Sequence, residues 1–118
     1  MGDLTKNLSR YEFACKCECG FDTIDYETLM ALQAVRDYYN QPVKVTSAAR
    51  CLRHNTRVGG KPNSLHLVGR AVDFTVAGVR PQEVQSYLAM KYEGEFGLGR
   101  YATFTHFDTR SGPAARWG

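Results

Sequence analysis

The sequence has 118 residues, a length that fits one domain with a modest core. Its apolar and charged fractions, 43% and 23%, are those of an ordinary globular protein, which argues against a disordered chain. The net charge is only +3 and the basic residues are scattered along the chain. Because no finger spacing, basic helix or RNA-binding motif accompanies them, we expect no nucleic-acid partner.

The opening residues 1–13 lack the apolar run of a signal peptide, and no stretch of the sequence is long and apolar enough to span a bilayer. We therefore expect a protein that is made in the cytoplasm without a signal peptide and that has no membrane partner. If it acts outside the cytoplasm, another component must release or export it.

The first expected elements are two helices. Ser9 and Glu12 have the spacing of a capping box, which predicts a short helix that ends before a run of three cysteines. Asp25 or Thr23 caps a longer helix that ends at residues 40–42, Asn-Gln-Pro. Apolar side chains recur within it at helical spacing, at Leu29, Leu32, Val35 and Tyr39.

The middle of the chain predicts two strands. Residues 43–47 alternate like a short strand, and residues 50–64 follow as an irregular segment with a Gly-Gly pair and a proline as turn signals. Residues 71–76 alternate strictly, which places Asp73 on the face opposite the apolar side chains. Those apolar side chains are Val72, Phe74 and Val76.

The last third predicts a helix and two strands. Pro81 suits the first position of a helix whose apolar face is formed by Val84, Leu88 and Tyr92. Residues 96–101 and 104–109 form two strands joined by a tight turn, and Phe104, His106 and Asp108 share one face of the second. We expect a small α+β fold, a single domain over residues 1–118, with an antiparallel sheet and flanking helices.

Three side chains could bind a metal ion. His66 lies in the turn before the strand that carries Asp73, and His106 lies on a neighbouring strand. Imidazole nitrogen and carboxylate oxygen are good zinc ligands, and a catalytic zinc keeps three protein ligands and one open position. Each residue alone also has an ordinary interpretation, as a core or surface histidine or a solvated aspartate, and the spacing by itself does not decide.

The four cysteines are a separate feature. Cys15, Cys17 and Cys19 form a C-x-C-x-C run, and Cys51 lies far downstream. In a reducing compartment this pattern indicates free thiols or a metal knuckle, and in an oxidising one it indicates disulfides. The usual structural zinc signature has two residues between paired cysteines, so all three interpretations stay open.

Several segments resemble one known family in the right order. Residues 64–74, SLHLVGRAVDF, resemble the S-x-H-x-x-G-x-A-x-D signature of the zinc D-Ala-D-Ala carboxypeptidase-like peptidoglycan peptidase family. That family shares a superfamily with the hedgehog signalling domain. Further resemblance is carried by residues 46–64 (TSAARCLRHNTRVGGKPNS), 97–117 (GLGRYATFTHFDTRSGPAARW) and 11–20 (YEFACKCECG). The resemblance therefore covers nearly the whole chain and implies a hedgehog/D-Ala-D-Ala peptidase-like fold.

The resemblance also implies roles for individual residues. It implies that His66, Asp73 and His106 bind one catalytic zinc ion. It implies that Arg50 contacts a carboxylate or carbonyl oxygen of the substrate, a role that suits the planar, always charged guanidinium. Without the resemblance, Arg50 would be an ordinary solvated loop residue. Ser64 either offers its hydroxyl to the substrate or caps the turn.

The general base is the departure from the family pattern. Many members of the superfamily carry a glutamate or aspartate three residues before the last histidine ligand, where this sequence has Thr103. Asp108 is the best substitute as a catalytic carboxylate because it shares a strand face with His106; its alternative role is to orient a ligand histidine. Glu93 or Glu95 either reaches in from a loop or is simply solvated.

We expect a zinc metallopeptidase that hydrolyses stem or cross-link peptides of bacterial peptidoglycan, as a carboxypeptidase or an endopeptidase. A compact catalytic domain without a leader resembles a phage endolysin, a bacteriolytic enzyme that degrades the cell wall after its release; a bacterial housekeeping peptidase is the rival setting. The alternative is a non-catalytic, zinc-stabilised binding or structural module of the same fold, which the threonine in place of a carboxylate favours. We expect a monomer whose partners are peptidoglycan peptides.

Overall fold

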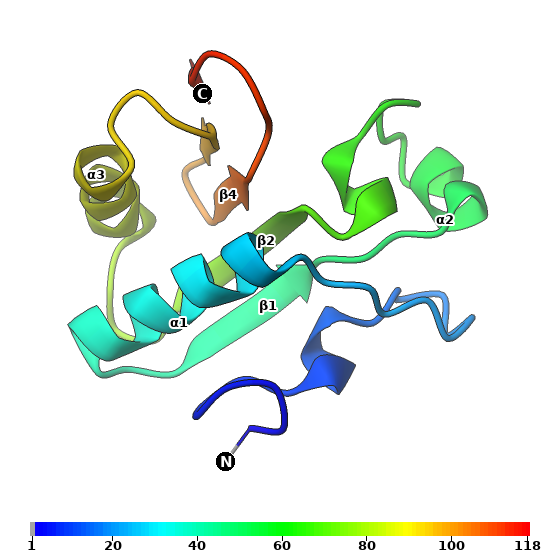
Figure 1. Cartoon of the computed structure of the whole chain (residues 1–118), viewed down its shortest axis with the longest axis horizontal. Coiled ribbons are helices and arrows are strands. Elements are labelled where there is room, and N and C mark those ends of the chain that lie inside the picture. The colour runs from blue at the N-terminus through cyan, green and yellow to red at the C-terminus, as the bar shows by residue number, and fades with distance from the viewer. Residues whose placement is uncertain (1) are drawn as a thin grey trace.

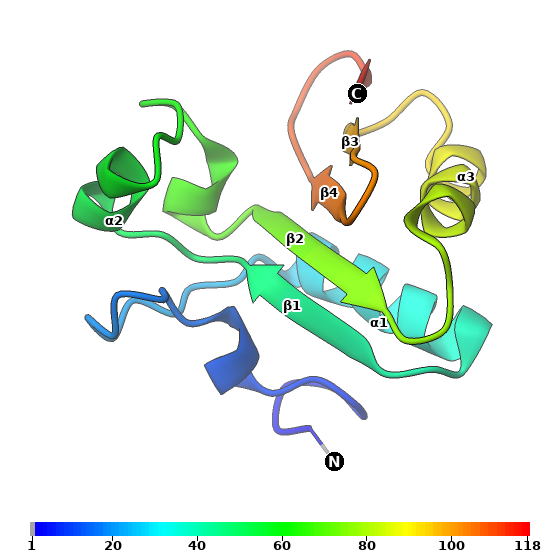
Figure 2. The same ribbon diagram turned by 180° about the vertical axis from the view of Figure 1, so that it is seen from behind.

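A five-stranded sheet of order β1-β2-β4-β3-β5 forms the centre of the computed structural model, which describes residues 2–118. Its strands are β1 (Val43–Ser47), β2 (Ala71–Val76), β3 (Gly97–Arg100), β4 (Thr105–Asp108) and β5 (Ala115–Trp117). The helices are α1 (Tyr26–Tyr39), α2 (Leu52–Arg57) and α3 (Pro81–Lys91), with short 3-10 helices η1 (Arg10–Phe13) and η2 (Leu65–Val68). Figures 1 and 2 show α1 lying along β1 and β2, α3 beside β3 and β4, and α2 beyond one end of β1.

The core lies between the sheet and the helices. The predicted apolar face of β2 is confirmed, since its three alternating apolar side chains are buried in one cluster with those of α1 and α3. These residues are Val72, Phe74 and Val76 of β2, Leu29, Leu32 and Val35 of α1, and Val84 and Leu88 of α3. Burial of aliphatic and aromatic area is the main stabilising contribution to such a fold.

The predicted helix starts are also confirmed. The backbone N–H of Ser9 donates to Glu12 Oε2 at 2.7 Å at the start of η1. Asp25 caps α1, because its carboxylate accepts from the N–H of Thr28 at 3.3 Å. The helix ends at Asn40 in the left-handed conformation, and α3 begins at its proline as expected.

The prediction of a purely antiparallel sheet is wrong at one edge, because β5 pairs with β3 in parallel. The end of β4 lies beside the start of β3, where Asp108 pairs with Gly97. The connection of residues 109–114 only has to cross to the other side of β3, where Ala115 also pairs with Gly97. The chain then runs in the direction of β3, so a short connection is enough to give a parallel pair and a mixed sheet.

The prediction that residues 50–64 are irregular is also wrong in part, because they contain α2. The Sγ of Cys51 accepts from the N–H of His54 at 3.4 Å and so caps a helix whose apolar pattern is too weak to detect. The Gly-Gly turn follows directly after this helix, at Gly59 and Gly60. The turn signals therefore mark the end of a helix.

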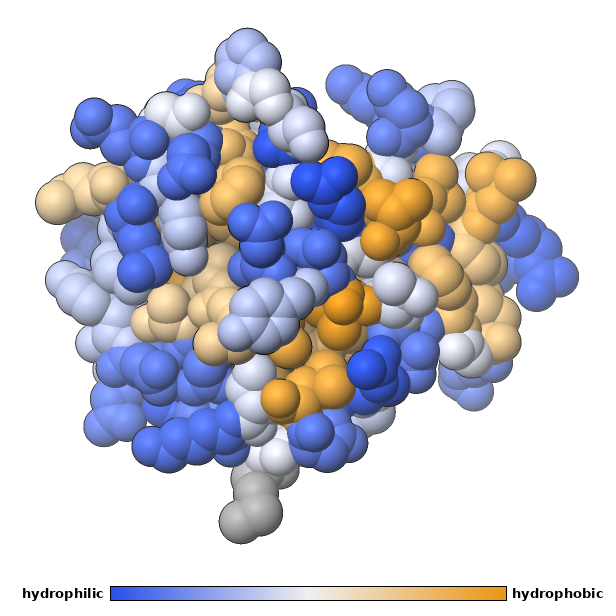
Figure 3. Space-filling view, in the orientation of Figure 1, coloured by the Kyte–Doolittle hydropathy of each residue, from blue (hydrophilic) through white to orange (hydrophobic). Residues whose placement is uncertain are grey.

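The surface is mixed in character. Figure 3 shows a mostly hydrophilic face, with hydrophobic patches toward the side of α2 and the N-terminal segment.

Among residues 2–118, none of the helices has the length and apolarity needed to cross a bilayer.

Gly69 fits η2 against the chain that enters α1. It ends η2 with a φ of 71°, in the left-handed region, and a Cβ at this position would overlap the carbonyl oxygen of Thr23. The carbonyl oxygen of Gly69 accepts from the N–H of Asp25 at 2.7 Å. The placement of η2 therefore depends on a residue without a side chain.

We predict that Gly69→Ala destabilises the protein more than Gly78→Ala does. Both glycines have a positive φ, but a Cβ at Gly78 meets nothing within 4 Å. The control should lose about 1 kcal/mol through backbone strain alone. Gly69→Ala should lose roughly 1–3 kcal/mol more, because the Thr23 carbonyl must also move. Denaturant unfolding measures both, and equal losses would contradict the close approach at η2.

Candidate active site

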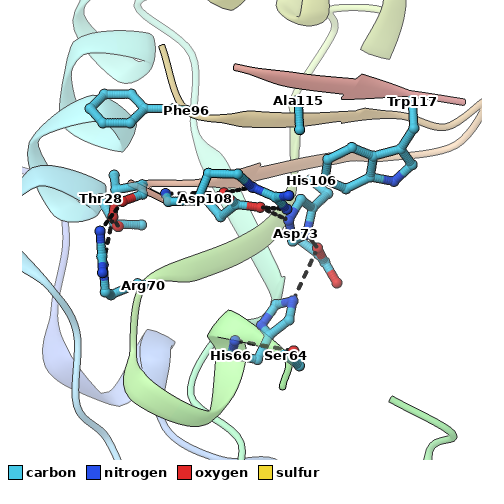
Figure 4. Close-up of polar contacts among 12 residues, drawn as sticks. Thr28, Ser64, His66, Arg70, Asp73, Phe96, His106, Asp108, Ala115 and Trp117 are labelled. Carbon is cyan, nitrogen blue, oxygen red and sulfur yellow. Dashed lines mark hydrogen bonds and ion pairs between the residues drawn. The ribbon is translucent and has the colours of Figure 1, made fainter. Parts of the chain in front are cut away.

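Three potential metal ligands converge on the polar face of the sheet. Asp73 on β2 and His106 on β4 are direct partners in the antiparallel pair, so their side chains share one face. His66 approaches from η2, immediately before β2. One ligand atom from each lies within 4.8 Å of the others. Figure 4 shows His66 pointing at Asp73 from one side and His106 from the other, so the structure brings the predicted ligand set together.

His66 is held in one tautomer. It is buried, and its Nδ1 lies 2.7 Å from the carbonyl oxygen of Ala48. A carbonyl oxygen only accepts, so Nδ1 carries the proton and Nε2 presents its lone pair. This Nε2 lies 3.4 Å from Asp73 Oδ1. The N–H of His66 donates to Ser64 Oγ at 3.2 Å, so Ser64 does cap the turn.

His106 lies between two carboxylates. Its Nδ1–H donates to Asp73 Oδ1 at 2.8 Å and its Nε2–H to Asp108 Oδ2 at 2.7 Å. Burial lowers the pKa of His106, but the hydrogen bonds to Asp108 and Asp73 outweigh it and raise the pKa above its ordinary value. Burial raises the pKa of Asp73, but the hydrogen bond from His106 and the closeness of His66 outweigh burial and bring the pKa down to about 2. Loss of the Nδ1 proton would expose the lone pair that a metal ion needs.

Asp108 is fully buried and its carboxylate is fully engaged. Arg110 donates to it twice, from Nε to Oδ1 and from Nη2 to Oδ2, each at 2.8 Å. Burial raises the pKa of Asp108, but the hydrogen bonds from Arg110 and His106 outweigh it and hold the pKa well below its usual range. A Cβ at Gly97 would overlap this carboxylate, so the glycine makes room for it. These contacts favour the orienting role over that of a proton acceptor.

A cleft of about 820 Å³ opens above the three ligands. Arg50 lines it, with Nε donating to Ser47 Oγ and Nη1 to Asn55 Oδ1, both at 3.2 Å. Its Nη2 lies 3.6 Å from Asp73 Oδ2. The guanidinium is therefore held beside the ligand set and within the cleft.

Aromatic side chains also line the cleft. The indole N–H of Trp117 donates to the hydroxyl of Tyr101 at 3.0 Å, and Tyr101 stacks on Phe104 with ring centroids 4.4 Å apart. The ring of Trp117 lies 5.2 Å from that of His106 and beneath the guanidinium of Arg110, at 5.0 Å. Sequence reasoning missed the tyrosine and the arginine. Arg110 lies two residues beyond the end of β4, so strand alternation does not place its side chain.

The other positions considered for the general base lie outside the cleft. Thr103 is exposed in the turn between β3 and β4. Glu93 and Glu95 are also exposed, and neither lines the cleft. Within residues 2–118, the acidic residues that line the cleft are Asp73 and Asp108.

Comparison with known proteins identifies relatives for most of the chain. The model of the peptidase M15 family matches residues 6–108, which include all three potential ligands. The probable peptidoglycan L,D-endopeptidase MepK of Haemophilus influenzae is 35% identical over 74 residues, or 61% of this chain. The matched stretch covers 38% of that relative, so the chain corresponds to well under half of its length.

We predict that Asp108→Asn lowers the pKa of His106, because it removes one of the two carboxylates that favour the imidazolium. An NMR titration of the His106 ring in chelator-treated protein measures this shift. Glu93→Gln is the control, since Glu93 is exposed and outside the cleft. An unchanged titration in Asp108→Asn would remove Asp108 from contact with His106.

The same contacts make the stability of the chelated protein depend on pH. The folded pKa of His106 is raised, so its ion pairs stabilise the fold fully below the unfolded pKa of about 6.5. This contribution is lost as the pH rises through the folded pKa. The melting temperature of the wild type should therefore exceed that of Asp108→Asn by more in acidic than in alkaline buffer.

Proposed function

This chain belongs to the peptidase M15 family, and from that premise we propose that it is a zinc-dependent peptidase that cleaves peptide bonds of bacterial peptidoglycan. The observation that carries the proposal is the convergence of His66, Asp73 and His106 at a cleft that Arg50 also lines. The relative named a probable peptidoglycan L,D-endopeptidase supports the substrate class. Cell-wall degradation is thus the proposed process, with phage lysis as its proposed setting.

The residues present fit a zinc ion. Two imidazole nitrogens and one carboxylate oxygen are a donor set of catalytic zinc sites, which leave a further position open. The second nitrogen of each histidine has a partner, the carbonyl oxygen of Ala48 for His66 and the carboxylate of Asp108 for His106. Such contacts orient metal-binding histidines. When bound here, zinc would supply polarisation of the scissile carbonyl and a lower pKa for water.

Arg50 binds the substrate in this proposal. Its contacts with Ser47 and Asn55 hold the guanidinium before a substrate arrives, so little conformational entropy is lost on binding. The planar fork suits a carboxylate of the stem peptide or the oxygen on which negative charge develops. The hydroxyl hydrogen of Ser64 is free to donate, since its oxygen only accepts from His66.

A second candidate function is a zinc-stabilised binding module without hydrolytic activity. It is favoured by the engagement of both acids that line the cleft, Asp73 with the histidines and Asp108 with Arg110 and His106. For Asp108 to accept a proton during hydrolysis, its carboxylate would have to give up its hydrogen bonds from Arg110. We favour the peptidase because the cleft and the arginine that lines it are suited to a peptide substrate.

Digestion of purified peptidoglycan by the zinc-loaded protein, with fragments identified by mass spectrometry, separates the two functions. We expect new peptide termini that disappear with a chelator and in His66→Ala. Loss of the terminal residue of a stem would identify a carboxypeptidase, and cleavage inside a stem or cross-link an endopeptidase. Stoichiometric zinc without cleavage of several wall types would contradict the proposal and support the binding module.

We predict that Arg50→Lys lowers kcat/KM about 10²–10³-fold while the zinc content is unchanged, because an ammonium group cannot reproduce the bidentate fork. Arg53→Lys is the matched control, since Arg53 is exposed nearby and does not line the cleft. Steady-state kinetics on the cleaved peptide measure both variants. Full activity in Arg50→Lys would remove the arginine from substrate binding.

A further inference from the structure

Four cysteine side chains from two distant segments meet outside the cleft. Cys15, Cys17 and Cys19 follow η1, and Cys51 precedes α2. All four Sγ atoms lie within 4.8 Å of one another. The Sγ of Cys17 lies 3.4 Å from that of Cys15 and 3.5 Å from that of Cys51, and the third separation, Cys15 to Cys51, is 3.9 Å. The sulfur atoms therefore surround one point.

These separations are those of a tetrahedral metal site. Zinc–sulfur bonds of about 2.3 Å place tetrahedral sulfur ligands about 3.8 Å apart, close to the three separations in this cluster. A disulfide requires about 2.05 Å and gives each sulfur one partner. Here all four cysteines are unpaired, and Cys15, Cys17 and Cys51 each have two sulfur neighbours. The arrangement thus fits a shared ion better than a pair of bonds.

The backbone is folded to bring alternate residues to this point. The N–H of Cys15 donates to the carbonyl oxygen of Phe21 at 2.7 Å, and the N–H of Glu18 donates to that of Cys15 at 3.1 Å. Glu18 has a φ of 63°, in the left-handed region that is strained for a residue with a side chain. Such a conformation persists where the surrounding structure requires it. The tight turn is what lets a C-x-C-x-C run act in place of the usual two-residue spacing.

Backbone donors also point at the sulfur atoms. The N–H of Cys51 donates to Cys15 Sγ and the N–H of His54 donates to Cys51 Sγ, each at 3.4 Å. Such bonds hold each sulfur atom in place and orient it as a ligand. Cys15 is buried while Cys19 is exposed, so the cluster is anchored in the fold and open to entry of an ion.

We propose that Cys15, Cys17, Cys19 and Cys51 bind a structural zinc ion, distinct from the site in the cleft. Four thiolates fill a tetrahedral coordination sphere, which is the character of a structural site, and soft sulfur ligands suit zinc.

This ion links the N-terminal segment to the residues of the cleft. Cys51 directly follows Arg50, and the N–H of Ala49 donates to the carbonyl oxygen of Phe13 at 3.0 Å. The neighbouring Ala48 holds the ring of His66. The zinc ion therefore fixes the loop that positions both the arginine and one histidine of the cleft.

Cobalt(II) substitution of the reduced, full chain tests this site by its absorption. We expect the intense visible bands and the thiolate charge-transfer band of a tetrahedral tetrathiolate site. The thiolate-to-cobalt charge-transfer band should persist in His66→Ala and disappear in the double variant Cys17→Ser/Cys51→Ser. Because His66→Ala removes the cleft site alone, failure of the proposed peptidase function leaves this result unaffected.

Zinc content gives the second measurement. We expect about two zinc ions per wild-type chain and about one in each of the two variants. Loss of a structural ion can unfold the chain, so the wild-type spectrum decides if the cysteine variant does not fold. The proposal would be overturned by a wild-type protein that shows no thiolate-to-cobalt absorption and whose cysteines are paired in disulfides. The same holds if that protein lacks the absorption and its cysteines are fully alkylated under native conditions with zinc present.

Discussion

The register between β2 and β4 is the constraint on which the rest of the structure depends. It places Asp73 directly opposite His106 and, on the other face, Val72 opposite Phe107. Because side chains alternate with a period of two, a slip of one residue would move the apolar side chains into the cleft and the polar ones into the core. The free energy gained by burying the apolar face therefore also fixes the geometry of the polar one, so the core positions the site.

Around this pair, each polar group is held by a neighbour from another element. Ala48 fixes the tautomer of His66, and Arg110 holds the carboxylate that contacts His106. The glycines of β3 take part by their lack of a side chain, since a Cβ at Gly99 would overlap Tyr101 and His106. The site is thus assembled by packing and hydrogen bonds before any ligand arrives, which is the arrangement that makes metal binding and substrate positioning specific.

Short sequence patterns predicted the features that depend on neighbouring residues alone. The alternation in β2 predicted both of its faces, and the capping residues predicted where η1 and α1 begin. The ligand set came from the resemblance, because spacing alone does not show that His66 and His106 converge. The sequence could not show the contacts of Asp108, because its partner Arg110 lies in a connection whose path is set by β5. The parallel pairing of β5 with β3 depends on the order of the strands in space, which the sequence does not show. The short helix α2 begins at a cysteine cap and has no strong apolar pattern, so it too was not predicted.

The proposed function requires His66, Asp73 and His106 to bind one zinc ion together at the floor of the cleft. Crystals of the zinc-loaded protein, measured on both sides of the zinc absorption edge, test it most directly. We expect an anomalous peak between these three side chains, with the remaining coordination position facing the cleft and Asp108 still in contact with His106. The zinc site would be contradicted by a map with no peak between these side chains, in which zinc is bound elsewhere and Asp73 remains hydrogen-bonded to His106.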